Sequence, residues 1–178
     1  MKLKINILTI TAFLMFQTLQ AQGQVPSVGT SVQGDFNGDG QKEFAFSVQT
    51  KIGEGNPMED GTADEFAVNF STDKFKSIDV GCCDIRLINE GDLNADGNDE
   101  ITVFQAPMNG CTYSMTTYSF VNNTWKTLIE SLLIPTGCDY LSDEEIQKRI
   151  FIENGKVYYY DVDSNDENFK LVKKSVKF

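Results

Sequence analysis

Short runs of β-branched and aromatic residues, separated by turn residues, recur along this chain and predict a protein made mainly of β-strands. A polar stretch rich in glycine and acidic residues, 51–64, predicts a long surface loop. Asn154 and Gly155 predict a tight hairpin, and the SDEE stretch at 142–145 predicts a capping box that starts one helical turn. The expected strands are a short one within 25–33, followed by 43–49, 65–70, 74–80, 84–89, 100–105, 112–121, 124–133, 149–153, 156–161 and 169–176.

Two of the turns share one pattern, GDFNGDGQKE at 34–43 and GDLNADGNDE at 91–100, and each leads into an apolar run. Oxygen-bearing side chains recur at alternate positions, which suits calcium, a hard cation that takes several oxygen ligands from a flexible loop. A glycine stands at the sixth position, where the loop must turn sharply. The expected calcium ligands, with Gln41 and Asn98 acting through their main-chain carbonyls, are Asp35, Asn37, Asp39, Gln41 and Glu43 in the first loop and Asp92, Asn94, Asp96, Asn98 and Glu100 in the second.

The alternative is that both stretches are hairpin turns without a metal, because the same residue types favour turns. The agreement of the two stretches at every donor position favours calcium. The loops are not EF-hands, since Phe46 and Val103 occupy the twelfth positions and the flanks predict strands rather than helices. The D-x-N-x-D-G-x-x-E pattern resembles the calcium loops of the FG-GAP and VCBS repeat families. That resemblance implies two calcium ions at the residues named and blade-like sheets, and it implies no single activity.

An internal repeat extends beyond the loops. The stretch FSTDKFKSI at 70–78 matches FVNNTWKTL at 120–128, and a third unit follows without the metal donors. Its acidic turn at 161–167 is interpreted as solvated. Phe75, Trp125 and Phe169 are expected at equivalent core positions. The predicted fold is therefore all-β, a propeller-like array of about three antiparallel blade units (25–82, 83–135 and 136–178) with two calcium loops and one short helix, in a single domain at 22–178.

The first 21 residues predict a secretory signal peptide, with Lys2 and Lys4, an apolar stretch at 5–16 and a small residue, Ala21, before the cleavage point. A membrane anchor is the alternative, although the apolar stretch is short for a span of about 20 residues. The expected location is the periplasm or the medium. Removal of this segment, which holds two lysines and no acidic residue, changes the formal net charge from −11 to −13. Such a surface disfavours nucleic acid and favours cations and basic partners.

Export makes disulfides plausible for the four cysteines. Bonds between neighbouring cysteines are rare because their geometry is strained. The expected bridges therefore join one of Cys82 and Cys83 to Cys111 and the other to Cys138, with the choice left open.

The chain holds no histidine, which excludes Ser–His and Cys–His catalysis and a histidine zinc site within it. Paired carboxylates would serve a glycoside hydrolase, but the obvious acidic clusters are assigned to calcium. The predicted function is a non-enzymatic, exported calcium-binding module for protein interaction, with loops 51–64 and 106–111 as recognition surfaces. The runner-up is a periplasmic inhibitor or immunity protein against a lysozyme-like cell-wall hydrolase, whose basic cleft an acidic protein would block.

Overall fold

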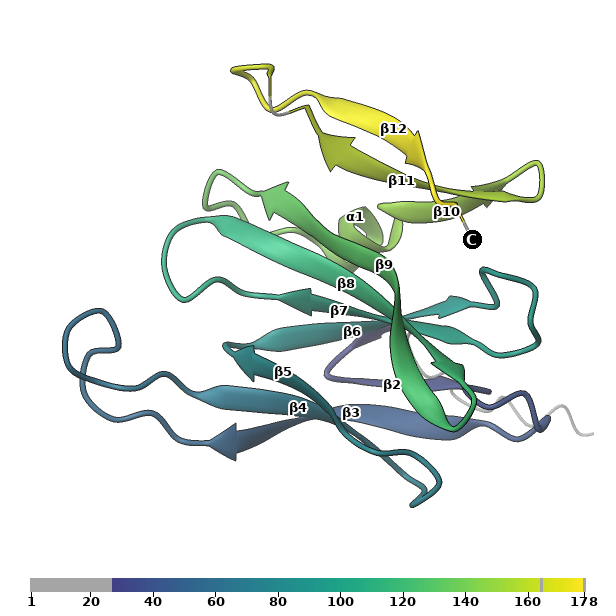
Figure 1. Cartoon of the computed structure of the whole chain (residues 1–178). Helices are drawn as coiled ribbons and strands as arrows, with labels where there is room; N and C mark the ends of the chain where they lie inside the picture. The colour runs from purple at the N-terminus through teal and green to yellow at the C-terminus, as the bar shows by residue number, and fades with distance from the viewer. Residues whose placement is uncertain (1–26, 164, 178) are drawn as a thin grey trace, which may run out of the picture.

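The protein consists of three antiparallel sheets, none of which is closed, stacked in layers (Figure 1). The computed structural model describes residues 27–163 and 165–177, so the signal peptide predicted for residues 1–21 lies outside the described residues. Within the described ranges, no helix has the length and apolar character that a membrane span requires. The all-β prediction is confirmed, and a propeller is not shown.

Each sheet draws its strands from one stretch of the chain, apart from β1. The four-stranded sheet has the order β2 (Ser31–Gly34), β3 (Glu43–Lys51), β4 (Glu65–Phe70), β5 (Ile78–Cys82). The five-stranded sheet has the order β1 (Val28–Gly29), β6 (Ile85–Gly91), β7 (Glu100–Gln105), β8 (Thr112–Val121), β9 (Thr124–Pro135). The third sheet, which follows α1 (Asp143–Gln147), has the order β10 (Ile150–Glu153), β11 (Lys156–Val162), β12 (Leu171–Ser175).

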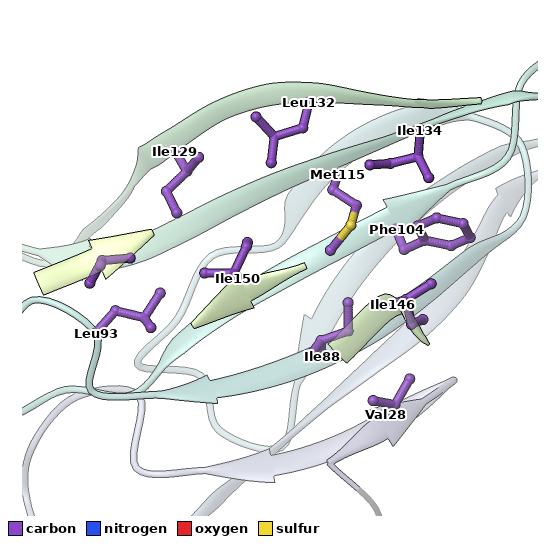
Figure 2. Packing of buried hydrophobic residues seen from close by; sticks show 11 residues of the cluster. Val28, Ile88, Leu93, Phe104, Met115, Ile129, Leu132, Ile134, Ile146 and Ile150 are labelled. Atoms are coloured by element: carbon purple, nitrogen blue, oxygen red, sulfur yellow. The ribbon is translucent and has the colours of Figure 1, made fainter. Parts of the chain in front are cut away.

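The five-stranded sheet is the middle layer and carries a hydrophobic core on each face. Adjacent residues of a strand point to opposite faces, so Val103 belongs to one core and Phe104 to the other. Figure 2 shows the core on the face of Phe104 and Met115, where Ile146 of α1 and Ile150 of β10 cover the sheet. The opposite face packs against the four-stranded sheet. Cover on both faces explains why β7 is buried at five consecutive positions, 100–104, instead of at alternate ones.

The two repeated hairpins meet in one aromatic cluster between these sheets. The rings of Phe70 and Trp125 stack with centroids 4.8 Å apart, and Phe75 lies edge-on to Phe120 at 4.6 Å. Because the Phe75 side chain turns into this cluster, the chain is irregular there, and β5 begins at Ile78 rather than at the predicted residue 74. The expectation of a third core aromatic at Phe169 is wrong, since that residue is 61% exposed.

The local signals near the end of the chain are confirmed. Ser142 caps α1, and its side chain and that of Glu145 form the reciprocal bonds of a capping box. Asn154 and Gly155 both have positive φ, of 51° and 71°, and connect β10 to β11 as a tight hairpin.

The predicted cysteine pairing is wrong. Cys111 pairs with Cys138, and Cys82 pairs with its neighbour Cys83. The first pairing follows from sheet topology: Thr112 of β8 lies opposite Pro135 of β9, which brings the residues beyond them to the same end of the hairpin, with Cα atoms 4.8 Å apart. The second pair occupies the reversal between β5 and β6, where Cys83 adopts a φ of 104°.

Replacing both Cys111 and Cys138 with serine should lower the free energy of unfolding by about 3 kcal/mol, because the bond closes a loop across a sequence separation of 27 residues. The melting temperature should fall by roughly 10 °C. The matched control is the double serine variant of Cys82 and Cys83, whose bond spans one peptide and restricts the unfolded chain far less. Equal losses in the two variants, measured by thermal denaturation, would contradict this assignment.

Candidate functional site

The two predicted calcium loops occupy equivalent places in the fold. The first connects β2 to β3 and the second connects β6 to β7. Each loop is closed by one strand pair, Gly34 opposite Glu43 in the first and Gly91 opposite Glu100 in the second. The last expected ligand of each loop is therefore also the first residue of a strand, which fixes the loop to the sheet.

Backbone N–H groups hold the side-chain oxygens of both loops in the same pattern. In the first loop, Asp39 N–H donates to Oδ1 of Asp35 (3.1 Å) and to Oδ1 of Asn37 (2.9 Å). Gly40 N–H donates to the other Asp35 oxygen (2.8 Å), and Gln41 N–H donates to Oδ1 of Asp39 (2.9 Å).

The second loop repeats each of these bonds. Asp96 N–H donates to Oδ1 of Asp92 (3.1 Å) and of Asn94 (2.9 Å), Gly97 N–H donates to Asp92 Oδ2 (3.0 Å), and Asn98 N–H donates to Asp96 Oδ1 (2.9 Å). The first four expected ligands therefore lie on backbones with the same hydrogen-bonding pattern in the two loops.

The fifth expected ligand of each loop is a buried glutamate. Glu43 is 7% exposed and Glu100 is fully buried. One carboxylate oxygen of each accepts a bond from the N–H of the loop's second residue, Phe36 for Glu43 (3.2 Å) and Leu93 for Glu100 (2.7 Å). The other oxygen accepts from the loop asparagine, at 3.1 Å in the first loop and 3.3 Å in the second. These bonds orient a carboxylate toward the interior of each loop.

Burial makes these carboxylates costly to ionise. Burial, together with the nearby charges of Asp96 and Asp92, raises the pKa of Glu100 to about 7, against the opposing bonds from Ser119 and Leu93. Burial and the charges of Asp39 and Asp35 likewise raise the pKa of Glu43, against the bond from Phe36 N–H. Crowded, partly desolvated carboxylates of this kind are stabilised by a nearby cation.

A third acid, the half-buried Glu90 near the end of β6, was not singled out by the sequence, because a glutamate at a strand end carries no local signal. Its Oε1 is buried with no hydrogen-bond partner among the described residues. Burial of its carboxyl group, with a contribution from the Glu100 charge, raises the pKa of Glu90 to about 8, against the opposing effect of the Thr102 hydroxyl.

The two loops contact each other through Asp99, the eighth residue of the second loop. Asp35 N–H donates to the Asp99 carboxylate (3.0 Å), and Asp99 N–H donates to the Asp35 carbonyl (2.8 Å). The Asn89 side chain donates to Asp99 (3.2 Å) and to the Gln33 carbonyl (2.8 Å). The first loop has Lys42 at the position of Asp99, so the contact runs in one direction only.

The loops also differ at their third donor. Lys74 Nζ lies 2.8 Å from Asp39 Oδ2, and this bond lowers the pKa of Asp39. The residue that aligns with Lys74 in the second hairpin is Thr124, so Asp96 meets no corresponding cation there. A lysine at a carboxylate competes with a metal ion for that ligand.

The chemistry of the donor set fits calcium, since carboxylate, amide and carbonyl oxygens recur within each loop. The carboxylates are turned toward N–H groups and Lys74. Among the residues that the structure describes, no three acidic or cysteine side chains converge as a metal-binding group. Comparisons with protein-family models, with curated proteins and with solved structures gave no match to this chain.

The two loops predicted as recognition surfaces lie at the other end of the sheets. Loop 51–64 leaves the far end of β3, and loop 106–111 leaves the far end of β7 (Figure 1). The loops meet where Asn109 Nδ2 donates to the Met58 sulfur (3.3 Å). Together with Cys83 and Asp84 they line a hollow of about 360 Å³. The sequence thus identified both loops, but their proximity depends on the stacking of the two sheets.

The fourth position of each loop offers a test of backbone strain. Gly38 has a φ of 69° and the equivalent Ala95 has a φ of 60°. Ala95→Gly should raise the free energy of unfolding by about 0.5–1 kcal/mol, because the left-handed conformation is costly for alanine. Gly38→Ala should lower it by more than this, since the added Cβ would also lie 2.6 Å from Asn98 Oδ1 and 2.9 Å from the Gly97 carbonyl. Chemical denaturation measures both, and changes of the same sign would contradict the shared geometry.

The raised pKa values of Glu90 and Glu100 predict how stability depends on pH. From the ordinary pKa of 4.5 up to about 7 and about 8, the folded state binds more protons than the unfolded state, so stability falls as pH rises. In chelator, the free energy of unfolding should decrease between about pH 5 and about pH 8 by up to about 1.4 kcal/mol per pH unit for each group, and the melting temperature should fall with it. Glu90→Gln should flatten the profile, whereas Glu59→Gln, in the exposed loop, should leave it unchanged. A melting temperature that rises over this range would contradict the burial of these acids.

Proposed function

We propose that this protein is an exported, non-enzymatic, calcium-binding module for protein interaction that binds one calcium ion in each loop. The observation that carries the proposal is the repetition of the whole donor set on the same hydrogen-bonded backbone, 57 residues apart in the chain. In the first loop the ligands are Asp35, Asn37, Asp39, the Gln41 carbonyl and Glu43. In the second they are Asp92, Asn94, Asp96, the Asn98 carbonyl and Glu100.

The strand arrangement supports the same proposal. Strands β2–β5 and β6–β9 each form an antiparallel meander of four strands, which is the content of a propeller blade. In both meanders the metal loop connects the first strand to the second. This shared arrangement agrees with the resemblance to the FG-GAP and VCBS families. We propose that units equivalent to their blades are stacked here as layers.

An interaction role is supported by the two ends of the molecule. The calcium loops fix one end of β3 and β7, and the recognition loops extend from the other end. Loops on a rigid scaffold commonly carry recognition. The two disulfides are consistent with an oxidising compartment outside the cytosol.

Calcium titration followed by calorimetry tests the metal assignment. We expect two ions per chain and a melting temperature that rises with calcium and falls with chelator, because an ion that binds the folded state stabilises it by linkage. Asp39→Ala and Asp96→Ala should each remove one ion. Lys74→Ala should raise the affinity of the first loop, since the amine no longer competes for Asp39, and Lys76→Ala, on the same turn, is the control.

A melting curve that is unchanged between excess calcium and excess chelator would remove the metal from the proposal. Equal effects of Lys74→Ala and Lys76→Ala would show that the lysine acts through net charge and not at the loop.

The second candidate is an inhibitor or immunity protein of a lysozyme-like cell-wall hydrolase, favoured by the formal net charge of −11 on the whole chain. It is separated from a general interaction module by one assay. Purified protein would be added to a panel of basic muramidases, and full activity of every enzyme at a large excess of the protein would exclude this candidate.

A further inference from the structure

The bonded pair Cys82–Cys83 occupies the connection between two sheets. β5 of the four-stranded sheet ends at Cys82, and β6 of the five-stranded sheet begins at Ile85. Only Cys83 and Asp84 separate these strands, so the bond closes a small ring where the chain passes from the first repeat to the second. Neither the calcium loops nor the interaction function proposed above gives this bond a task.

A bond between neighbouring residues is strained by the sequence itself. Neighbours joined by a trans peptide have Cα atoms about 3.8 Å apart, whereas most disulfides join Cα atoms about 4.4–6.8 Å apart. Cys111 and Cys138, at 4.8 Å, lie within that range. The backbone of Cys83 is strained as well, because its φ of 104° lies in a region that residues with a Cβ rarely adopt. Strained disulfides are the more easily reduced ones.

The pair is within reach of a small thiol compound. Cys82 and Cys83 are both half-buried, and Cys83 lines the hollow of about 360 Å³ between loops 51–64 and 106–111. A thiol that enters this hollow therefore meets the bond from the side of Cys83. The other bond is no less accessible, since Cys138 is exposed. Strain, and not exposure, is thus the property that separates the two bonds.

The surroundings confine any movement to the connection. The Gln105 side chain donates a hydrogen bond to the Cys82 carbonyl, and Ala106 N–H donates to the Asp84 carbonyl (2.9 Å). The residues on either side of Cys83 are therefore held at the end of β7 by bonds that do not involve sulfur. When the sulfur–sulfur bond opens, Cys83 can leave its strained conformation while the sheets stay paired, and the wall of the hollow changes with it.

We propose that Cys82–Cys83 is a thiol-exchange site, at which a dithiol reduces the bond and thereby reshapes the hollow between loops 51–64 and 106–111. One thiolate of the dithiol attacks Cys83 Sγ and forms a mixed disulfide, and the Cys82 sulfur leaves as a thiolate. The second thiolate of the dithiol attacks the dithiol sulfur of the mixed disulfide and releases Cys83. The dithiol becomes a disulfide, its two electrons reduce the protein bond, and the two protons that it loses are matched by two taken up at the cysteine sulfurs.

The test exposes the whole calcium-loaded protein to mixtures of reduced and oxidised dithiothreitol. Free thiols are trapped with N-ethylmaleimide and located by peptide mass spectrometry. Cys82 and Cys83 should open at a ratio of reduced to oxidised dithiothreitol at least about tenfold lower than Cys111 and Cys138 require, because the strained bond has the more oxidising potential.

Nuclear magnetic resonance on the same samples tests the change of shape. When the pair opens, the amide signals of residues 81–84 and of the hollow residues 53, 64, 66 and 108 should shift, and those of the repeated loops 35–43 and 92–100 should not. The double serine variant of Cys82 and Cys83 should match the reduced protein at these positions and should not respond to the same mixtures. In the double serine variant of Cys111 and Cys138, the pair should open at an unchanged ratio.

Three results would overturn the proposal. Free thiols at Cys82 and Cys83 in protein purified without a reductant would show that there is no bond to exchange. Opening of both bonds at one ratio, or of Cys111–Cys138 first, would show that the bond between neighbours is not the labile one. An opened pair without signal shifts at the hollow would remove the link between the bond and the hollow. Calcium binding is measured separately, so this inference and the proposed function fail independently.

Discussion

A buried glutamate at the first residue of a strand is the constraint on which this structure depends. Glu100 accepts a bond from the loop backbone with one oxygen and faces the loop asparagine with the other. The next residues of the same strand, Ile101 and Thr102, are fully buried, and Val103 and Phe104 enter opposite cores. The chemistry of the loop and the packing of the middle sheet are thus joined within five residues.

This connection places two different kinds of surface at the two ends of the sheets. β3 and β7 each begin at one of the two repeated loops, and they are followed by loops 51–64 and 106–111. The crowded carboxylates of the repeated loops lie at one end, and the exposed side chains of Met58 and Met108 lie at the other. The sheets between these ends are held together by two hydrophobic cores and an aromatic cluster.

Local features of this fold were predictable from sequence, and long-range features were not. The strands, the capping box at Ser142 and the hairpin at Asn154 follow from neighbouring residues, as does the equivalence of the two loops. The pairing of Cys111 with Cys138 required knowing that β8 and β9 are neighbours along their full length. The burial of Phe75 and the exposure of Phe169, which the repeat made equivalent, depend on whether a second sheet covers the turn.

The residues of the candidate site were likewise predictable where the signal is local, and not where it depends on long-range contacts. The ten expected ligands, which the structure places on two equivalent loops, were predicted from spacing alone. Lys74, Asp99 and Glu90 were not, because each acts on a loop through contacts that the folded sheets create. A carboxylate in the next repeat or a lysine in a hairpin carries no sign of its partner in a linear sequence.

The one-way contact between Asp99 and Asp35 gives the two repeats a fixed order. The carboxylate of Asp99 in the later copy accepts the N–H of Asp35 in the earlier copy. The earlier copy has Lys42 at the position of Asp99, and a lysine side chain cannot accept such a bond. An engineered array with the copies exchanged would leave the N–H of Asp35 facing solvent and place a lysine beside the first residue of its neighbour. Each copy added after the first therefore needs an aspartate at the position that Lys42 holds in the first loop. Its carboxylate can then accept the N–H of the first loop residue in the preceding copy.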